Sequence, residues 1–87
     1  MPEVVVYTVA WCPYCRMAVQ LLRDKGVPFE QIDVDGNREK RAWLREVTGQ
    51  STVPQIFVGG RSLGGYTDVA GMDRRGELDP LLAGEPA

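Results

Sequence analysis

The chain has 87 residues, of which 44% are hydrophobic and 25% charged, and its formal net charge is −2. These values fit a single globular domain over residues 1–87 and leave no room for a second core. Residues 83–87 are expected to form a frayed tail. Charges of both signs are spread along the chain, no segment approaches the ~20 apolar residues of a membrane span, and the N-terminus lacks the features of a secretion signal. We therefore expect a cytoplasmic protein without a membrane or nucleic-acid partner. We also expect it to be a monomer.

The first half of the chain predicts a strand followed by a helix. Residues 4–8 (VVVYT) are apolar and β-branched, as in a strand that is covered on both faces. A helix is expected from Pro13 to Lys25, because proline suits the first helical turn and the following Gly26 is a stop signal. The residues predicted to form its inward stripe are Met17, Ala18, Leu21 and Leu22.

A second strand and a second helix are predicted to follow. The strand is expected at residues 28–34 and a turn at residues 35–37. Asn37 is predicted to cap the helix, which ends near Gly49. The positions expected to face the core are Ala42, Trp43 and Val47.

The second half of the chain predicts a hairpin and a third helix. Residues 55–58 (QIFV) and 61–63 (RSL) flank a Gly-Gly pair, which supplies the positive φ of a tight hairpin turn. Thr67 is predicted to cap the third helix, and residues 79–82 (DPLL) to form a last short turn with a cap and a proline at its first position. The expected order is strand, helix, strand, helix, strand, strand, helix, which makes the chain an α/β protein.

The two cysteines of the chain, Cys12 and Cys15, lie in the segment WCPYC between the first strand and the first helix. A structural disulfide is disfavoured, because it would close a very short loop and small disulfide scaffolds usually carry four or more cysteines. A zinc site is also disfavoured, because the chain has no histidine to complete a set of four ligands. A C-x-x-C segment at a helix start is typical of a thiol–disulfide redox site.

The two sulfurs are expected to differ in reactivity. Unpaired N–H groups at the helix start favour an anion, so Cys12 is the predicted nucleophile and leaving group. Cys15 lies one turn into the helix, where we expect lower exposure and a higher pKa. Among the aromatic residues, Tyr14 is expected to contact the substrate, Trp11 to be either a groove wall or core, and Trp43 to be core.

Three motifs that occur in order resemble those of the dithiol glutaredoxins: CPYC at 12–15, TVP at 52–54 and GG-x-x-D at 64–68. The similarity extends over nearly the whole chain and is greatest to the short bacterial members. It implies a thioredoxin-like fold, with a four-stranded mixed sheet flanked by helices and a cis peptide bond before Pro54, beside the cysteine pair. It also implies glutathione as a co-substrate and no tightly bound cofactor.

By this resemblance, the backbone of Val53 pairs with glutathione in the manner of an added β-strand. The region of Thr67 and Asp68 then supplies N–H groups and an acid for the γ-glutamyl end. Arg41 is a candidate for the glycyl carboxylate, although it also fits a charged helix face. The implied glutathione-binding residues are Tyr14, Arg41, Thr52, Val53, Pro54, Gly65, Tyr66, Thr67 and Asp68.

Two positions depart from the family pattern. Many relatives carry lysine three residues before the first cysteine, whereas this chain has Val9, so one cation that supports the thiolate and binds glutathione is missing. The common GGC motif is GGY here, and Tyr66 is expected to change the shape of the groove near the γ-glutamyl end.

The leading hypothesis is an enzyme that reduces protein–glutathione mixed disulfides and small or protein disulfides through Cys12 and Cys15. Its partners are then glutathione and client proteins that carry glutathionylated or disulfide-bonded cysteines. One alternative is a thioredoxin-like electron donor that a thioredoxin reductase reduces, and the WC before the pair is reminiscent of that group. Another is a carrier, in which a dimer bridges a [2Fe–2S] cluster through Cys12 of each chain and glutathione. Pro13 and Tyr14 argue against the carrier.

Overall fold

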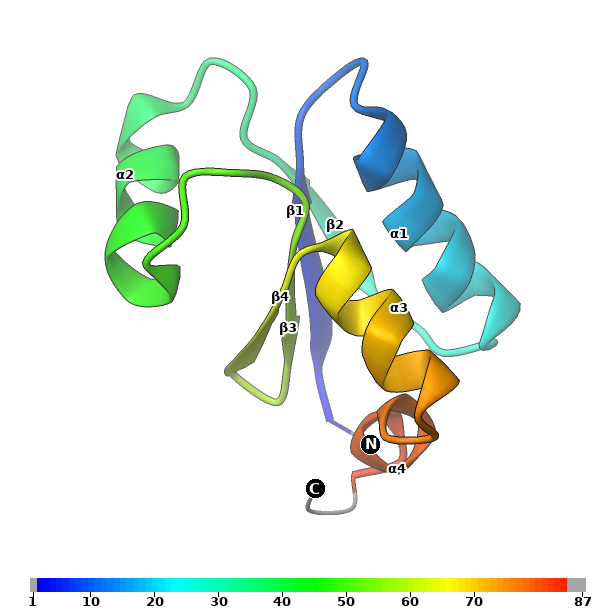
Figure 1. The fold of residues 1–87 in the computed structure, drawn as a ribbon. Coiled ribbons are helices and arrows are strands. Elements are labelled where there is room, and N and C mark those ends of the chain that lie inside the picture. Colours follow the sequence, from blue (N-terminus) through cyan, green and yellow to red (C-terminus); the bar gives the residue numbers. More distant parts are fainter. Residues whose placement is uncertain (1, 85–87) are drawn as a thin grey trace.

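The computed structural model describes residues 2–84, which form one four-stranded sheet with helices on both faces (Figure 1). The strands are β1 (Val4–Thr8), β2 (Glu30–Asp33), β3 (Gln55–Val58) and β4 (Arg61–Gly64). The helices are α1 (Pro13–Asp24), α2 (Arg38–Thr48), α3 (Tyr66–Arg74) and α4 (Leu78–Leu82). Within residues 2–84, no helix is long and apolar enough to cross a membrane.

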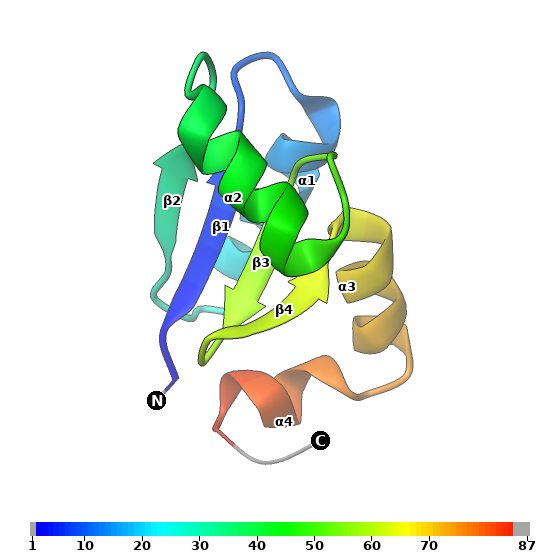
Figure 2. The same ribbon diagram turned by 90° about the vertical axis from the view of Figure 1, so that its left-hand side faces the viewer.

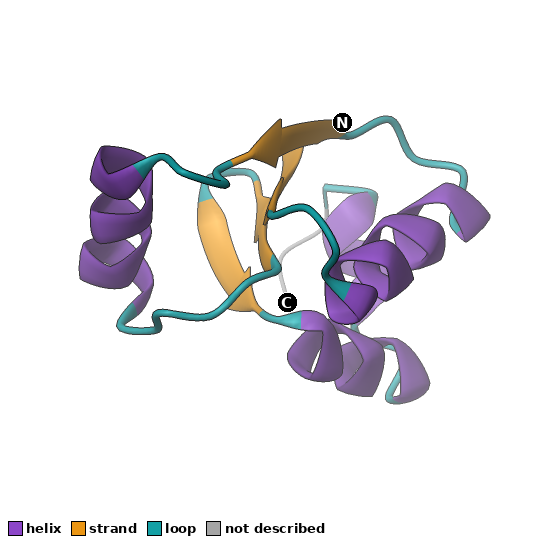
Figure 3. Cartoon of the chain, turned by 90° about the horizontal axis from the view of Figure 1, so that it is seen from above, coloured by secondary structure: helices purple, strands orange, loops and turns teal. Residues whose placement is uncertain are grey.

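The sheet has the strand order β2-β1-β3-β4. β1 pairs in parallel with β2 and antiparallel with β3, and β3 pairs antiparallel with β4. Figures 2 and 3 show α2 on one face of the sheet and α1 with α3 on the other. This architecture confirms the predicted four-stranded mixed sheet flanked by helices, and α4 is the short turn predicted near the end of the chain.

β1 contributes to both halves of the core, because successive side chains of a strand point to opposite faces. Val4 and Val6 belong to the larger cluster, which packs against α1, α3 and α4. Val5 and Tyr7 belong to the smaller cluster, which contains Leu44 of α2. All residues of β1 are buried, as its apolar sequence predicted.

The inward face of α1 differs from the prediction. Its buried residues are Cys15, Ala18, Val19 and Leu22. Met17 is 44% exposed and Leu21 is only partly buried. Cys15 and Val19 complete an i, i+3, i+4, i+7 stripe, and Met17 lies outside that stripe.

The inward face of α2 also differs, because this helix buries only Leu44. The residues predicted to face the core, all of which are exposed, are Ala42, Trp43 and Val47. Trp43 is 38% exposed, and its ring stacks on Phe57 at a centroid distance of 6.1 Å and lies 5.7 Å from Tyr7. Figure 3 shows no other helix beside α2 on its face of the sheet within residues 2–84. Trp43 stays partly exposed and contacts Tyr7 and Phe57 at the rim of the smaller cluster, which it does not fill.

The ends of α2 are those predicted. Asn37 is the N-cap, and its Oδ1 accepts a hydrogen bond from the N–H of Lys40 at 2.9 Å. The helix ends at Gly49, which has a φ of 73°. A left-handed backbone at this position favours glycine, because a Cβ would clash with the following carbonyl.

The last two helices begin earlier than predicted. The N-cap of α3 is Gly65, whose N–H donates to Asp68 Oδ2 at 2.9 Å, so Thr67 lies inside the first turn and is not the cap. The carboxylate that reaches back to Gly65 fixes this start. α4 begins at Leu78, and Pro80 occupies its third position rather than its first. Proline is tolerated there because the first N–H groups of a helix have no intrahelical partner.

The chain after α4 was predicted to fray. The N–H of Gly84 donates to Leu81 O at 3.1 Å, so residues 83–84 are still hydrogen-bonded to α4. The rest of the predicted tail, residues 85–87, lies outside the described residues.

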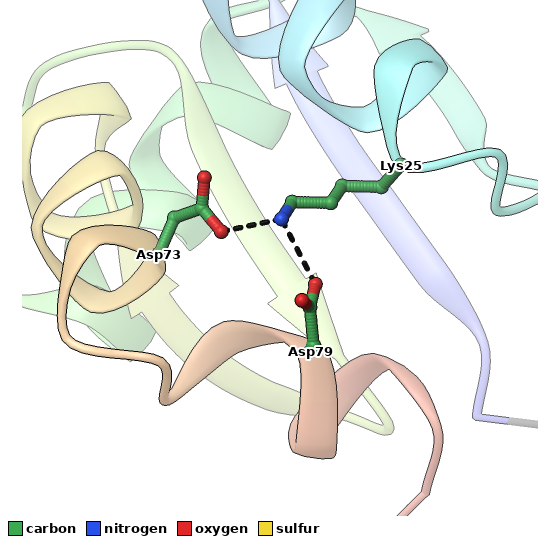
Figure 4. A network of polar contacts seen from close by, with 3 residues as sticks. All are labelled: Lys25, Asp73 and Asp79. Carbon is green, nitrogen blue, oxygen red and sulfur yellow. Dashed lines mark ion pairs between the residues drawn. The ribbon is translucent and has the colours of Figure 1, made fainter.

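Lys25, which follows α1, joins three helices (Figure 4). Its ammonium forms ion pairs with Asp73 of α3 at 2.5 Å and with Asp79 of α4 at 3.0 Å. These carboxylates raise the pKa of Lys25 above its ordinary value, so the ammonium stays charged at neutral pH. The network fixes the end of α1 against the C-terminal helices, at the opposite end of α1 from the cysteines.

Candidate active site

Cys12 and Cys15 lie where the chain passes from β1 into α1. Cys12 is the N-cap of α1, and its Sγ accepts a hydrogen bond from the N–H of Cys15 at 3.2 Å. Cys12 is partly exposed, whereas Cys15 is only 3% exposed. The structure therefore confirms the predicted difference in exposure between the two sulfurs.

Burial raises the pKa of the Cys15 thiol to about 12, and its hydrogen bond with Cys12 acts in the same direction. A backbone hydrogen bond with Val9 and the positive charge of Arg41 oppose this shift. The thiolate is the form that attacks disulfides, so a thiol with this pKa is a poor nucleophile at neutral pH. Cys15 is therefore suited to act after Cys12 and not before it.

Alkylation of the reduced protein with iodoacetamide at pH 7 is expected to modify Cys12 and leave Cys15 free. At a pKa of about 12, only about 10⁻⁵ of Cys15 is thiolate at pH 7, and this fraction rises tenfold with each unit of pH. Intact-mass spectrometry should show one adduct in the native protein and two after unfolding in guanidinium chloride. The Cys15→Ser variant is the matched control and should give the same single native adduct. Equal labelling of both cysteines in the native protein would contradict this assignment.

The loop before β3 brings a backbone carbonyl next to Cys12. The Val53-Pro54 peptide bond is cis, as predicted, and Cys12 Sγ lies 3.9 Å from Val53 O. Gln55 is fully buried and holds this loop, because its Nε2 donates to Thr52 O at 2.9 Å and to Gln50 Oε1 at 3.0 Å. A buried amide of this kind fixes the loop at the position where the reactive sulfur meets it.

A groove of about 440 Å³ lies beside the cysteine pair. Figure 1 shows the start of α1, the loop before β3 and the start of α3, which supply its walls, at the same end of the sheet. The residues that line it are Tyr14, Gln50, Thr52, Val53, Pro54, Gly65, Tyr66, Thr67 and Asp68. All the residues implied for glutathione binding except Arg41 are thus brought together. Gln50 was not predicted, and its place shortly before TVP is the only sequence signal that points to it.

Arg41 lies outside the lining of the groove and contacts the loop that leads to it. Its Nη2 donates to Ser51 O at 3.3 Å, in the loop that leads to the groove. Its charge also acts on Cys15, as described above. The charge of Arg41 thus favours the Cys15 thiolate, in a chain that has Val9 where the family resemblance implies lysine. Its direct contact with a glycyl carboxylate stays a prediction.

Tyr66, the residue that departs from the GGC pattern, lies against Tyr14. The two ring centroids are 6.2 Å apart, and the rings are tilted by 33°. Tyr14 is 56% exposed, as expected for a residue that contacts a substrate, and Tyr66 is half-buried. The two rings form an aromatic wall of the groove, which a cysteine at position 66 could not provide.

The start of α3 presents hydrogen-bond donors to the groove. An α-helix leaves its first N–H groups without intrahelical partners, and together with the helix dipole these groups favour an anion. In α3 the first intrahelical bond runs from the N–H of Val69 to Gly65 O at 3.1 Å. The N–H groups of Tyr66 and Thr67 precede that bond, so they are available to a carboxylate bound in the groove.

An accessible cysteine at a helix start, with a buried cysteine one turn further on, can form and break a disulfide without an additional cofactor. A cysteine pair of this kind, on a four-stranded mixed sheet with this helix arrangement, is typical of thiol–disulfide oxidoreductases with a thioredoxin-like fold.

Comparison with known proteins identifies the family more closely. The family model described as Glutaredoxin matches residues 4–63, so the chain belongs to the glutaredoxin family. It is 52% identical over 83 residues to the glutaredoxin of Pseudomonas aeruginosa, covering 95% of this chain and 99% of that protein. It is 46% identical over 82 residues to glutaredoxin 3 of Escherichia coli strain K12, covering 94% and 99%. The crystal structure of the buckwheat glutaredoxin–glutathione complex is similar, with a TM-score of 0.87 at 33% identity, over 94% of this chain and 77% of that one.

Proposed function

We propose that this chain uses glutathione to reduce protein–glutathione mixed disulfides, and small or protein disulfides, through Cys12 and Cys15. The observation that carries the proposal is the groove of about 440 Å³, whose lining residues lie beside the accessible sulfur. Its volume falls within the range of ~300–1,000 Å³ that small-molecule sites occupy. The similar buckwheat structure is a complex with glutathione, which supports the same ligand here.

In this proposal, glutathione lies extended along the loop before β3. The backbone of Val53 pairs with it as an added strand, and its sulfur then lies near Cys12, whose Sγ is 3.9 Å from Val53 O. The γ-glutamyl carboxylate meets the N–H groups at the start of α3, and the Asp68 carboxylate meets the ammonium. Tyr14 and Tyr66 cover one side of the ligand. The remaining contacts are assigned to Thr52, Pro54, Gly65 and Thr67.

The proposed reaction has two exchange steps. The Cys12 thiolate attacks the glutathione sulfur of a mixed disulfide, the bond between that sulfur and the client sulfur breaks, and the client leaves as a thiolate that takes up a proton. A second glutathione thiolate then attacks the glutathione sulfur held on Cys12, which gives glutathione disulfide and restores the Cys12 thiolate. Alternatively, Cys15 loses its proton and attacks Cys12, which releases glutathione and leaves a Cys12–Cys15 disulfide.

The decisive test compares two reducing systems with one small mixed disulfide, over pH 4 to 9. Glutathione with glutathione reductase and NADPH is expected to sustain turnover, and thioredoxin reductase with NADPH is not. The opposite result would favour the thioredoxin-like alternative and contradict the proposal.

The Asp68→Asn variant is expected to raise the KM for glutathione about fivefold, because the loss of an exposed ion pair with the ammonium weakens binding by about that factor. Asp35→Asn is the control, since Asp35 is an exposed acid outside the groove. The initial rate is measured as a function of glutathione concentration. An equal KM in both variants would remove Asp68 from the proposed contact.

A further inference from the structure

A second hollow, of about 460 Å³, is lined in part by Cys12 and shares no lining residue with the glutathione groove. Its walls are the loop after β1, one stripe of α1 and the edge strand β2. The residues that matter here are Trp11, Cys12, Arg16, Gln20, Arg23 and Gln31. In the proposed exchange, the client residues around the departing cysteine need a surface that glutathione does not occupy. This hollow provides such a surface next to the reactive sulfur.

The hollow is positively charged, although the chain as a whole has a net charge of −2. Arg16 and Arg23 line it, and no acidic residue among residues 2–84 does. Both arginines are exposed, and neither forms an ion pair within residues 2–84, where the paired cations are Lys25 and Arg75. Arg16, Gln20 and Arg23 are spaced i, i+4, i+7, which places them on one stripe of α1. An acidic ligand therefore meets, on one helix face, two guanidinium groups that no carboxylate within residues 2–84 pairs with.

Trp11 adds an apolar element to the rim of this hollow. Its side chain is 87% exposed, and its backbone has a φ of 60°, a region that costs a bulky residue free energy. The Arg16 guanidinium lies 5.7 Å from the ring centroid. Burial does not stabilise this ring in the free protein. An exposed tryptophan beside an arginine is the composition that protein interfaces favour.

We propose that this hollow binds the client protein, through a segment that carries acidic side chains near its reacting cysteine. Along α1, which rises ~1.5 Å per residue, Arg16 lies about 6 Å and Arg23 about 16 Å from Cys12. An extended client segment advances ~3.3 Å per residue, so its acids fall about two and about five residues from its cysteine. The inference rests on the proposed function, because it assigns the second substrate of the same exchange, and it adds no chemical step.

The test uses peptides of 11 residues with a central glutathionylated cysteine in a Gly/Ser sequence. One peptide carries aspartate two and five residues before and after the cysteine, so that either chain direction is covered, and its partner carries asparagine at the same places. The ratio of their kcat/KM values is expected to be about tenfold in favour of aspartate at low ionic strength, and to approach one at high salt. The R16E/R23E variant should reverse this preference.

R45E/R61E is the matched control, because it changes the net charge by the same amount at exposed arginines outside the hollow. Arg45 also lies in the last turn of its helix, α2, just as Arg23 lies in the last turn of α1. It should keep the ratio of the unchanged protein to within about twofold. Equal ratios in R16E/R23E and the unchanged protein, or an equal shift in both variants, would overturn the inference alone. Absence of glutathione-dependent turnover of the asparagine peptide by the unchanged protein would overturn the proposed function, and this inference with it.

Discussion

Replacing Cys12 with serine is expected to lower the turnover of every disulfide substrate by about a thousandfold or more, because the loss of a nucleophile commonly costs that much. Cys15 cannot take over this role. It is 3% exposed, and burial raises its pKa to about 12, so its thiolate is scarce at neutral pH and its sulfur is covered. The measurement is the glutathione-coupled assay with a small mixed disulfide, on protein whose circular dichroism spectrum matches that of the unchanged chain.

Replacing Cys15 with serine is expected to separate the two routes of the reaction. Deglutathionylation should persist at a substantial rate, because a second glutathione can clear the adduct on Cys12 without a second protein sulfur. Reduction of a protein disulfide that uses both cysteines should be lost in this variant and in the Cys12→Ser variant alike. If the Cys12→Ser variant kept the turnover of the unchanged protein, the assigned roles of the two sulfurs would be wrong.

The reactive pair could be located from sequence because its determinants are local. The apolar run of β1, the proline after Cys12 and the position of Cys15 one helical turn later all lie within 12 residues, from Val4 to Cys15. The predicted difference in exposure follows from the geometry of one helix start, which such a segment fixes by itself. The groove residues could be named only through the resemblance, since they come from segments far apart in the sequence.

The error in the predicted inward face of α2 falls where tertiary packing decides. Helical spacing shows that α2 has an apolar stripe, but it does not show how closely the helix approaches the sheet. Leu44 alone is buried, and Trp43 lies at the rim against Phe57. In the same way, nothing in the sequence indicated that Tyr66 would pack against Tyr14, or that the stripe of α1 that carries Arg16 and Arg23 would border a hollow.

Replacing Gly64 with alanine is expected to lower the free energy of unfolding by about 2–4 kcal/mol, which is a large part of the stability of a small domain. Gly64 has a φ of 96°, which an L-residue adopts at a cost. An added Cβ would also collide with the side chain of Asp68, which would have to turn away. The hydrogen bond from the N–H of Gly65 to Asp68, which fixes the start of α3, would then be lost. Because both partners line the groove, the KM for glutathione should rise as well.

Gly60→Ala is the control that separates backbone strain from collision. Gly60 has a φ of 81°, and a Cβ there would meet no atom of residues 2–84 within 4 Å, so only the strain of about 1 kcal/mol is expected and the KM should stay unchanged. Urea unfolding of both variants measures the difference. Adding Asp68→Ala should cost less in the Gly64→Ala protein than in the unchanged chain, because the hydrogen bond is already broken. If Gly64→Ala were no less stable than Gly60→Ala, the contact with Asp68 would not determine how α3 begins.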